Sequence, residues 1–193
     1  PPTRTAAPRR LLRCARVGSR VGDAIHPDIL AALAVPASPL HAALASKVSR
    51  ERVGIEVDKM LSGRDPRYAL QLLSQLQLYW VVFMPPPALS QRMGRSSDHG
   101  AHIDELVHDA PDERAALSLS DSFDSLLRDT SPLWSRLPAD WLARVRAPDW
   151  SAQRRLVWYA IALLPLRDLY VQAKKPPAWA GAGTFSAGLK LGR

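Results

Sequence analysis

Arginines recur every three residues near the start of the chain, at Arg10, Arg13 and Arg16, in a stretch of twenty residues that contains no acidic side chain. The guanidinium group presents fixed N–H donors that match the oxygens of a phosphate. This ladder can therefore contact the phosphates of a nucleotide or of an RNA. The alternative is a solvated helix face, which is the usual state of an arginine-rich helix.

A second charged segment, ASKVSRERVGIEVDKMLSGRDP, covers residues 45–66 and carries both signs of charge. Lys47, Arg50 and Arg52 are its candidate contacts to RNA phosphates. The alternative is an internal network, in which Glu51 and Glu56 pair with arginines and join neighbouring helices. Both interpretations stay open on the sequence alone.

The only candidate metal cluster is His99-x-x-His102, with His108 and Asp109 behind it. A structural zinc site needs about four ligands in closed geometry, and these histidines lie in a segment rich in Gly and Ser. We therefore expect no metal site and no cofactor in this chain. Cys14 has no histidine close in sequence, which favours a buried helix residue over a nucleophile.

Other side chains of chemical interest have ordinary structural explanations. Asp121 and Asp124 share a helix face, and surface acid is the simpler interpretation than an acid/base pair. The tryptophans of the second half could stack on RNA bases, but at helical spacing they are typical of a core; these are Trp134, Trp141, Trp150 and Trp158. No residue is assigned a catalytic role.

Composition places the chain among basic globular proteins. Its 193 residues carry a formal net charge of +8 with a pI near 10.2, so the surface attracts polyanions. The single cysteine excludes an intrachain disulfide and fits a reducing compartment. No apolar run approaches the roughly 20 residues of a membrane span, so no membrane association is expected. The first twenty residues also have the composition of a mitochondrial transit peptide, but they run into HPDILAAL without a processing-like break.

Helical spacing dominates the apolar pattern, which predicts an all-α fold. Ser49 and Asp65 are expected N-caps of successive helices, and the segment LYWVVF is expected to be helical because no partner strand is evident. We divide the chain into a neck of short helices (1–84), a linker or mobile loop (85–103), and a smaller irregular helical body or tail that contacts tRNA (104–193).

These motifs resemble a known family. HPDILAAL, followed by VSRERVGIEVDKMLSGRDPRYALQLL, is similar to the neck of the tRNA nucleotidyltransferase and poly(A) polymerase family, whose members include the CCA-adding enzymes. Upstream, PRRLLRCARVGSRVG is similar to the family's arginine-rich helix. The likeness is strong over 8–83 and looser beyond.

The resemblance implies tRNA as the partner and nucleotide binding by Arg10, Arg13 and Arg16, with RNA binding by Lys47, Arg50 and Arg52. In the family a separate catalytic head holds magnesium with paired carboxylates and uses CTP and ATP. The sequence contains no Gly-Gly-x-Val-Arg-Asp turn of that head. We therefore expect this chain alone to be inactive and to work with such a head in a longer protein. A stand-alone RNA-binding adaptor, or a silent degenerate fragment, is the alternative.

The chain departs from the family at one informative place. The aspartate that pairs with the incoming base falls within an acidic pair that is Ala6 and Ala7 here, whereas the partner arginine is kept as Arg10. A methyl group cannot accept a hydrogen bond from a base amino group, which puts base discrimination in doubt. The compartment is expected to be intracellular, mitochondrial or cytoplasmic/nuclear.

Overall fold

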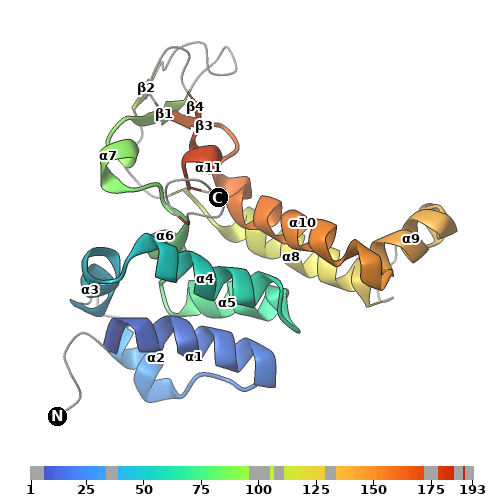
Figure 1. The fold of residues 1–193 in the computed structure, drawn as a ribbon, viewed down its shortest axis with the longest axis horizontal. Helices are drawn as coiled ribbons and strands as arrows, with labels where there is room; N and C mark the ends of the chain where they lie inside the picture. The colour runs from blue at the N-terminus through green and yellow to red at the C-terminus, as the bar shows by residue number, and fades with distance from the viewer. Residues whose placement is uncertain are drawn as a thin grey trace.

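The computed structural model describes residues 7–33, 39–95, 105–106, 111–128, 134–171, 178–184 and 189. The chain is predominantly helical, which confirms the predicted class. The first half forms a layer of short helices in the lower part of Figure 1: α1 (Ala7–Val21), α2 (Pro27–Leu33), α3 (Pro39–Lys47), α4 (Arg50–Leu61), α5 (Pro66–Gln75) and α6 (Tyr79–Phe83). In this layer α1 packs against both α4 and α5.

The second half is built on two long helices that pack against each other, α8 and α10 (Figure 1). The short helix α9 lies at their far end. The elements of this half are α7 (Pro87–Ser90), α8 (Arg114–Leu127), η1 (Trp134–Arg136), α9 (Ala139–Arg146), η2 (Pro148–Trp150), α10 (Ser151–Leu163), η3 (Leu164–Leu166) and α11 (Ala180–Gly183). No helix in the described part of the chain is long and apolar enough to cross a membrane.

A small antiparallel sheet, absent from the prediction, lies at the top of Figure 1. Its strand order is β2-β1-β3-β4, with β1 (Met93–Arg95), β2 (Glu105–Leu106), β3 (Leu169–Val171) and β4 (Ala178–Trp179). Gly94 pairs with Leu106 on one side and with Tyr170 on the other. Strands of two or three residues are too short to show an alternating pattern. The first part of the predicted linker therefore contains α7 and β1, and the predicted loop beyond Arg95 lies outside the described residues.

The two predicted N-caps of the neck helices are confirmed. Ser49 accepts a hydrogen bond from the backbone N–H of Arg52, and Asp65 accepts one from the N–H of Tyr68, so both act as N-caps. Pro66 occupies the first helical position after the Asp65 cap, where its missing N–H costs nothing. The ambiguous LYWVVF segment is helical over Tyr79–Phe83.

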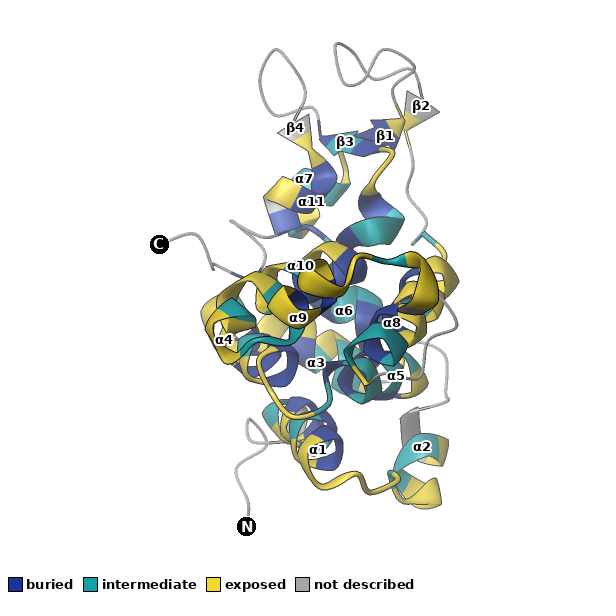
Figure 2. Cartoon of the chain, turned by 90° about the vertical axis from the view of Figure 1, so that its right-hand side faces the viewer, coloured by how far each residue is buried: buried dark blue, intermediate teal, exposed yellow. Residues whose placement is uncertain are grey.

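The apolar side chains that recur at helical spacing along α4, α5 and the α5 C-cap are buried. Their members are at most 1% exposed: Val53, Val57, Met60, Leu61, Ala69, Leu72, Leu73 and Leu76. Each such side chain contributes about 1.5–3 kcal/mol on transfer from water. Buried residues lie where the helices face one another, as Figure 2 shows. One hydrophobic cluster joins the two halves, running from Leu11 to Leu189.

Arg50 ties α4 to the end of α6. Its Nη1 donates to the carbonyl of Val81 at 2.9 Å, and its Nη2 donates to the carbonyls of Val82 at 2.7 Å and Met84 at 3.3 Å. The last carbonyls of a helix have no intrahelical partner, so the guanidinium satisfies acceptors that would otherwise be orphaned. Burial lowers the pKa of Arg50 from its usual value.

Gly54 allows the backbone of Leu189 to pack directly against α4. The Leu189 side chain is 1% exposed, and its backbone carbonyl lies so close to Gly54 that a Cβ there would overlap it. Residues 54 and 189 are therefore in backbone contact, which only glycine permits at this position.

Replacing Gly54 with alanine should destabilise the protein. Alanine favours a helix over glycine by about 1 kcal/mol, but the added methyl must displace the Leu189 backbone, and overpacking of this kind costs about 1–3 kcal/mol. Chemical denaturation should show a lower midpoint for Gly54→Ala, while Ile55→Ala, at an exposed neighbour, should change little. A more stable Gly54→Ala variant would contradict the Gly54–Leu189 contact.

Replacing Arg50 with lysine should lower the free energy of unfolding by about 1–3 kcal/mol, because one ammonium cannot reach three carbonyls and buried acceptors are left unpaired. The midpoint of thermal unfolding measures this. Arg52→Lys, at an exposed position on the same helix, is the matched control and should be neutral within about 0.5 kcal/mol. Unchanged stability together with weaker RNA binding would instead support an RNA-facing Arg50.

Candidate functional site

The arginine ladder lies on α1, whose opposite face is buried. Leu12 and Ala15 are fully buried against α4 and α5, which fixes the rotation of the helix. Because successive residues turn by about 100° around a helix axis, residues three apart do not form a straight line but drift around it. The three predicted arginines therefore meet different surroundings.

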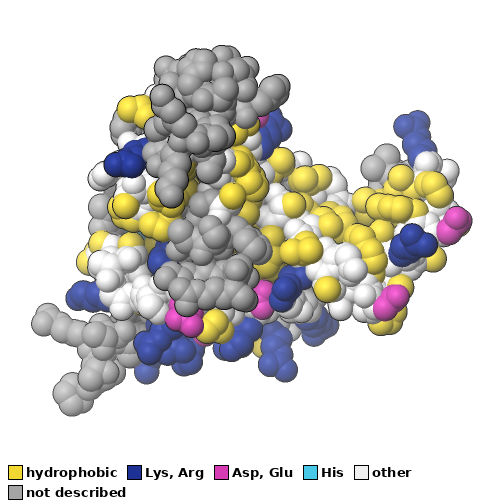
Figure 3. Space-filling model, turned by 45° about the horizontal axis from the view of Figure 1, so that its top comes forward, with side chains coloured by type: hydrophobic (Ala, Val, Ile, Leu, Met, Phe, Trp, Pro, Cys, Tyr) yellow, Lys and Arg dark blue, Asp and Glu magenta, His cyan; other side chains and the backbone are white. Residues whose placement is uncertain are grey.

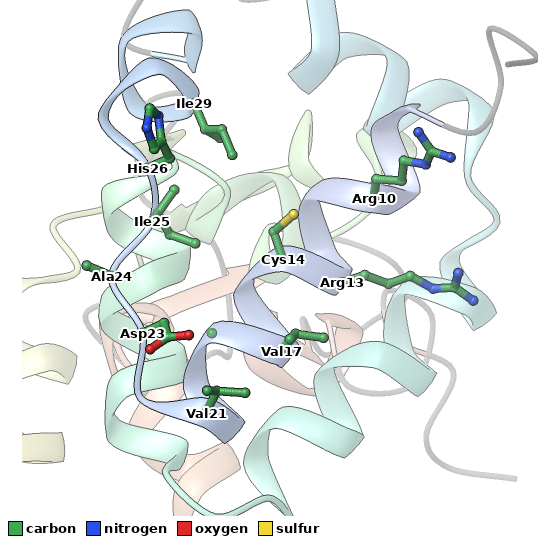
Figure 4. Close-up of a pocket in the computed structure, with 11 residues that line it drawn as sticks. Arg10, Arg13, Cys14, Val17, Val21, Asp23, Ala24, Ile25, His26 and Ile29 are labelled. Atoms are coloured by element: carbon green, nitrogen blue, oxygen red, sulfur yellow. The ribbon is translucent and has the colours of Figure 1, made fainter. Parts of the chain in front are cut away.

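Arg10 and Arg13 border a hollow of about 440 Å³ between α1 and the segment that leads into α2. Figure 4 shows their guanidinium groups extending from α1, while Ile25 and Ile29 face α1 from the other side. The lining is mainly apolar and includes Cys14, Val17, Val21, Ile25 and Ile29. Val17 and Val21 are 48% and 56% exposed. We call this hollow the apolar hollow.

An apolar floor with guanidinium groups at its edge suits a planar ring that carries a phosphate. The ring can lie on the aliphatic side chains, and the arginines can donate to the anion. Cys14 is half-buried and not disulfide-bonded. It lines the hollow together with apolar side chains such as Val17 and Ile25.

Arg16 faces the other way and pairs with a buried carboxylate. Its Nε donates to Glu56 Oε2 at 2.8 Å, and the Nε of Arg13 lies 3.8 Å from Glu56 Oε1. The Glu56 side chain is only 5% exposed. A carboxylate this deeply buried needs cationic partners, so the pair joins α1 to α4 as the internal network predicts. Glu51 is exposed.

The three predicted RNA contacts of the second charged segment, Lys47, Arg50 and Arg52, also lie in different surroundings. Lys47 and Arg52 are exposed, near the end of α3 and the start of α4, and neither lines the apolar hollow or the two hollows described below. Arg50 is directed inward to the α6 carbonyls, which favours its structural role. The assignments of all six residues to nucleotide or RNA remain predictions.

A second hollow of about 440 Å³ lies where the C-terminal ends of α1 and α4 approach each other. Its lining is basic: Arg16, Ser19, Arg20, Lys59, Gly63 and Arg64. We call it the basic hollow. Sequence spacing alone does not group these cations, because they come from two helices and a turn that are some 40 residues apart. Lys and Arg side chains gather along the lower edge of the molecule in Figure 3, over the helical layer.

The remaining candidates are mostly structural. Asp124 is buried and pairs with Arg128 at 2.7 Å and with Arg67 at 3.4 Å, and the Asp124 hydrogen bond raises the pKa of Arg128. Asp121 accepts hydrogen bonds from Arg67 and Gln71. These contacts join α8 to α5 and give neither carboxylate the freedom of an acid/base catalyst.

The tryptophans divide between core and surface. Trp158 is buried against Phe123, with ring centroids 5.0 Å apart, and Trp150 packs on the core. Trp141 is 43% exposed on α9. The predicted histidine cluster lies outside the described residues, and within the described part no three His, Cys, Asp or Glu side chains are grouped to hold a metal.

Comparison with known proteins identifies an RNA-binding family region within the first half of the chain. Residues 24–92 match the family model described as "Probable RNA and SrmB- binding site of polymerase A". This match covers α2 to α7 and includes the segment with Lys47, Arg50 and Arg52. No solved structure matches the chain significantly.

Relatives with known activity match over a similar length. The mitochondrial CCA tRNA nucleotidyltransferase of Saccharomyces cerevisiae is 42% identical over 76 residues, which are 39% of this chain and 14% of that enzyme. A tRNA nucleotidyltransferase of Schizosaccharomyces pombe is 41% identical over 81 residues, 42% of this chain and 16% of the relative. The CCA-adding enzyme of Bacillus subtilis is 43% identical over 70 residues, 36% and 16% of the two chains.

The matched segment is thus about a seventh of the length of these relatives. The family-model match over residues 24–92 covers the helices of the second charged segment. In this region the chain is similar to tRNA nucleotidyltransferases.

Proposed function

We propose that this chain is the tRNA-holding neck and body of a CCA-adding tRNA nucleotidyltransferase. The observation that carries the proposal is the match of residues 24–92 to an RNA-binding region, in a chain whose net charge is +8. Such a module positions RNA through its phosphates and leaves sequence choice to other contacts.

The apolar hollow supports a place for the incoming nucleotide next to the RNA. Arg10 and Arg13 would donate to its phosphates or its base edge, and the aliphatic floor would support its ring. Ala6 and Ala7 stand where the family has its acidic pair, so this chain offers no acceptor there for an amino group of cytosine or adenine. We infer nucleotide binding with weak selection between bases.

The chemistry of nucleotide addition belongs, in this proposal, to a catalytic head. Magnesium, CTP and ATP would be held there by paired carboxylates, which stabilise the attacking and leaving oxygens. The two buried carboxylates among the described residues, Glu56 and Asp124, are engaged by arginines instead. The compartment would be that of the enzyme's tRNA, mitochondrial or cytoplasmic/nuclear.

A stand-alone RNA-binding adaptor is the second candidate, and Ala6 and Ala7 favour it. An adaptor would bind tRNA without any need to select CTP or ATP. Adding a purified catalytic head from a related enzyme separates the two candidates: only the enzyme module should support addition of CMP and AMP by that head.

Binding of tRNA should weaken steeply with salt. Three to five phosphate contacts imply a slope of log affinity against log salt of about −2 to −4. The double variant Arg10→Gln/Arg13→Gln should flatten the slope by about 1.4–1.8, and helicity measured by circular dichroism should be kept, because glutamine is a good helix former. Arg16 is kept in this variant, because without it the buried Glu56 carboxylate would lose its hydrogen-bonded arginine.

Arg92→Gln/Arg144→Gln removes the same charge from exposed positions on other elements and serves as the control. It should change the slope by less than the α1 double variant. Affinity for tRNA that does not depend on salt would contradict the proposed function. Equal slopes for the two variants would show that Arg10 and Arg13 do not contact RNA phosphates.

The isolated chain should not extend tRNA. With magnesium, CTP and ATP present, a labelled tRNA that ends at its discriminator base should keep its length, because no group of three or more His, Cys, Asp or Glu side chains in the described residues is placed to hold a metal ion. Gel analysis at single-nucleotide resolution measures this, with the Bacillus subtilis CCA-adding enzyme as the positive control. Magnesium-dependent incorporation by the purified chain would show that the catalytic site lies within it.

A further inference from the structure

We propose that the basic hollow binds a phosphodiester of the RNA backbone, held by Arg20, Lys59 and Arg64. The inference rests on the proposed function, because it assigns a specific surface to the RNA that the chain is proposed to hold. It concerns residues other than the six assigned above to nucleotide and RNA, apart from Arg16 in the wall of the hollow.

The charge of the hollow is not neutralised by the protein. Arg20, Lys59 and Arg64 are exposed, and among the described residues none of them has an acidic partner. Arg16, which also lines the hollow, is engaged by the Glu56 carboxylate. Three like charges around one hollow repel one another, and a bound anion relieves that repulsion.

A neighbouring hollow of about 310 Å³ provides the contrast. It shares Gly63 and Arg64 with the basic hollow and also contains Arg128, Arg154 and Arg155. These three arginines are engaged by protein acceptors. Arg128 pairs with Asp124 and Asp65, Arg155 pairs with Asp58 at 3.2 Å, and Arg154 donates to two backbone carbonyls. Of these two hollows, the basic hollow is the one in which three clustered cations lack acidic partners among the described residues.

Helix stability explains part of this cluster but not all of it. Arg20 lies in the last turn of α1 and Lys59 in the last turn of α4, where cations favourably oppose the negative end of the helix dipole. Arg64 lies in the turn between α4 and α5, outside both helices. Helix-dipole stabilisation therefore does not explain why Arg64 lies at the hollow. Its replacement should affect ligand binding without affecting helix stability.

The shape of the site fits a backbone phosphate. The hollow opens to solvent through exposed side chains, and a cation from each of α1, α4 and the turn borders it, so a phosphate can be approached from several sides. Its volume of about 440 Å³ leaves room for the sugars on either side. Lysine acts as a point charge and arginine as a planar donor, and both are common contacts to RNA phosphates.

The test measures tRNA affinity against salt for the whole chain. Arg20→Gln/Lys59→Gln/Arg64→Gln should flatten the slope by about 2–2.7, which corresponds to about a hundredfold loss at 0.1 M salt and little loss near 1 M. Arg92→Gln/Arg136→Gln/Arg144→Gln removes the same charge elsewhere and should flatten the slope by less than half as much. Arg64→Gln alone should flatten it by about 0.7–0.9 without changing the thermal midpoint.

The outcomes separate this inference from the proposed function. Wild-type protein that fails to bind tRNA overturns the proposed function and the inference with it. Salt-dependent binding by the wild type with equal slopes for the two triple variants overturns the inference alone. Inorganic tripolyphosphate serves as a free-phosphate probe: if the hollow variant loses tripolyphosphate binding but keeps the wild-type slope for tRNA, the hollow binds a small anion and the backbone assignment is wrong.

Discussion

The buried carboxylate of Glu56 constrains the whole neck. A charge with 5% of its side chain exposed is stable only beside a cation, and Arg16 supplies that cation from α1. The pair fixes the rotation of α1 on α4 together with the buried residues Leu12 and Ala15. Since the helix is fixed, the direction of every other arginine on α1 follows. Arg10 and Arg13 reach the apolar hollow, whereas Arg20 reaches the basic hollow.

The cations of this protein therefore fall into two groups that composition cannot separate. Arg16 and Arg50 are structural, because each satisfies protein acceptors that would be costly to leave unpaired: a buried carboxylate for one and the last carbonyls of α6 for the other. Arg20, Lys59 and Arg64 have no acidic partner in the described part of the chain. A net charge of +8 overstates the RNA-binding surface when all arginines are counted alike.

The two hollows share α1 as a common wall. One is apolar with arginines at its edge, and the other is basic and open. A single helix could thus place a nucleotide ring on one side and an RNA phosphate on the other, at a separation set by the width of the helix. This arrangement needs no catalytic group in the neck. Under the proposed function it would position two ligands, and positioning is a substantial part of catalysis when the reactants are held in line.

The tertiary contacts that order the second half are also contacts to the neck. Tyr79 on α6 donates to the carbonyl of Ala162 on α10 at 2.7 Å, and burial with the nearby Glu113 charge raises the pKa of this tyrosine well above its usual value. Tyr159 on α10 donates to Asp58 on α4. Neck and body are thus joined by specific hydrogen bonds as well as by apolar packing.

The sequence by itself determined the helical class, the neck helices and their caps, because apolar spacing, Ser49 and Asp65 act through local geometry. It did not determine the four-stranded sheet, whose strands are too short to show a period and pair across some 75 residues. From the sequence, Arg50 and Arg64 could not be told apart, because both are charged residues of the same segment. Only the tertiary structure distinguished them, because the role of a cation depends on which acceptors lie within reach of it, and those acceptors come from distant parts of the chain.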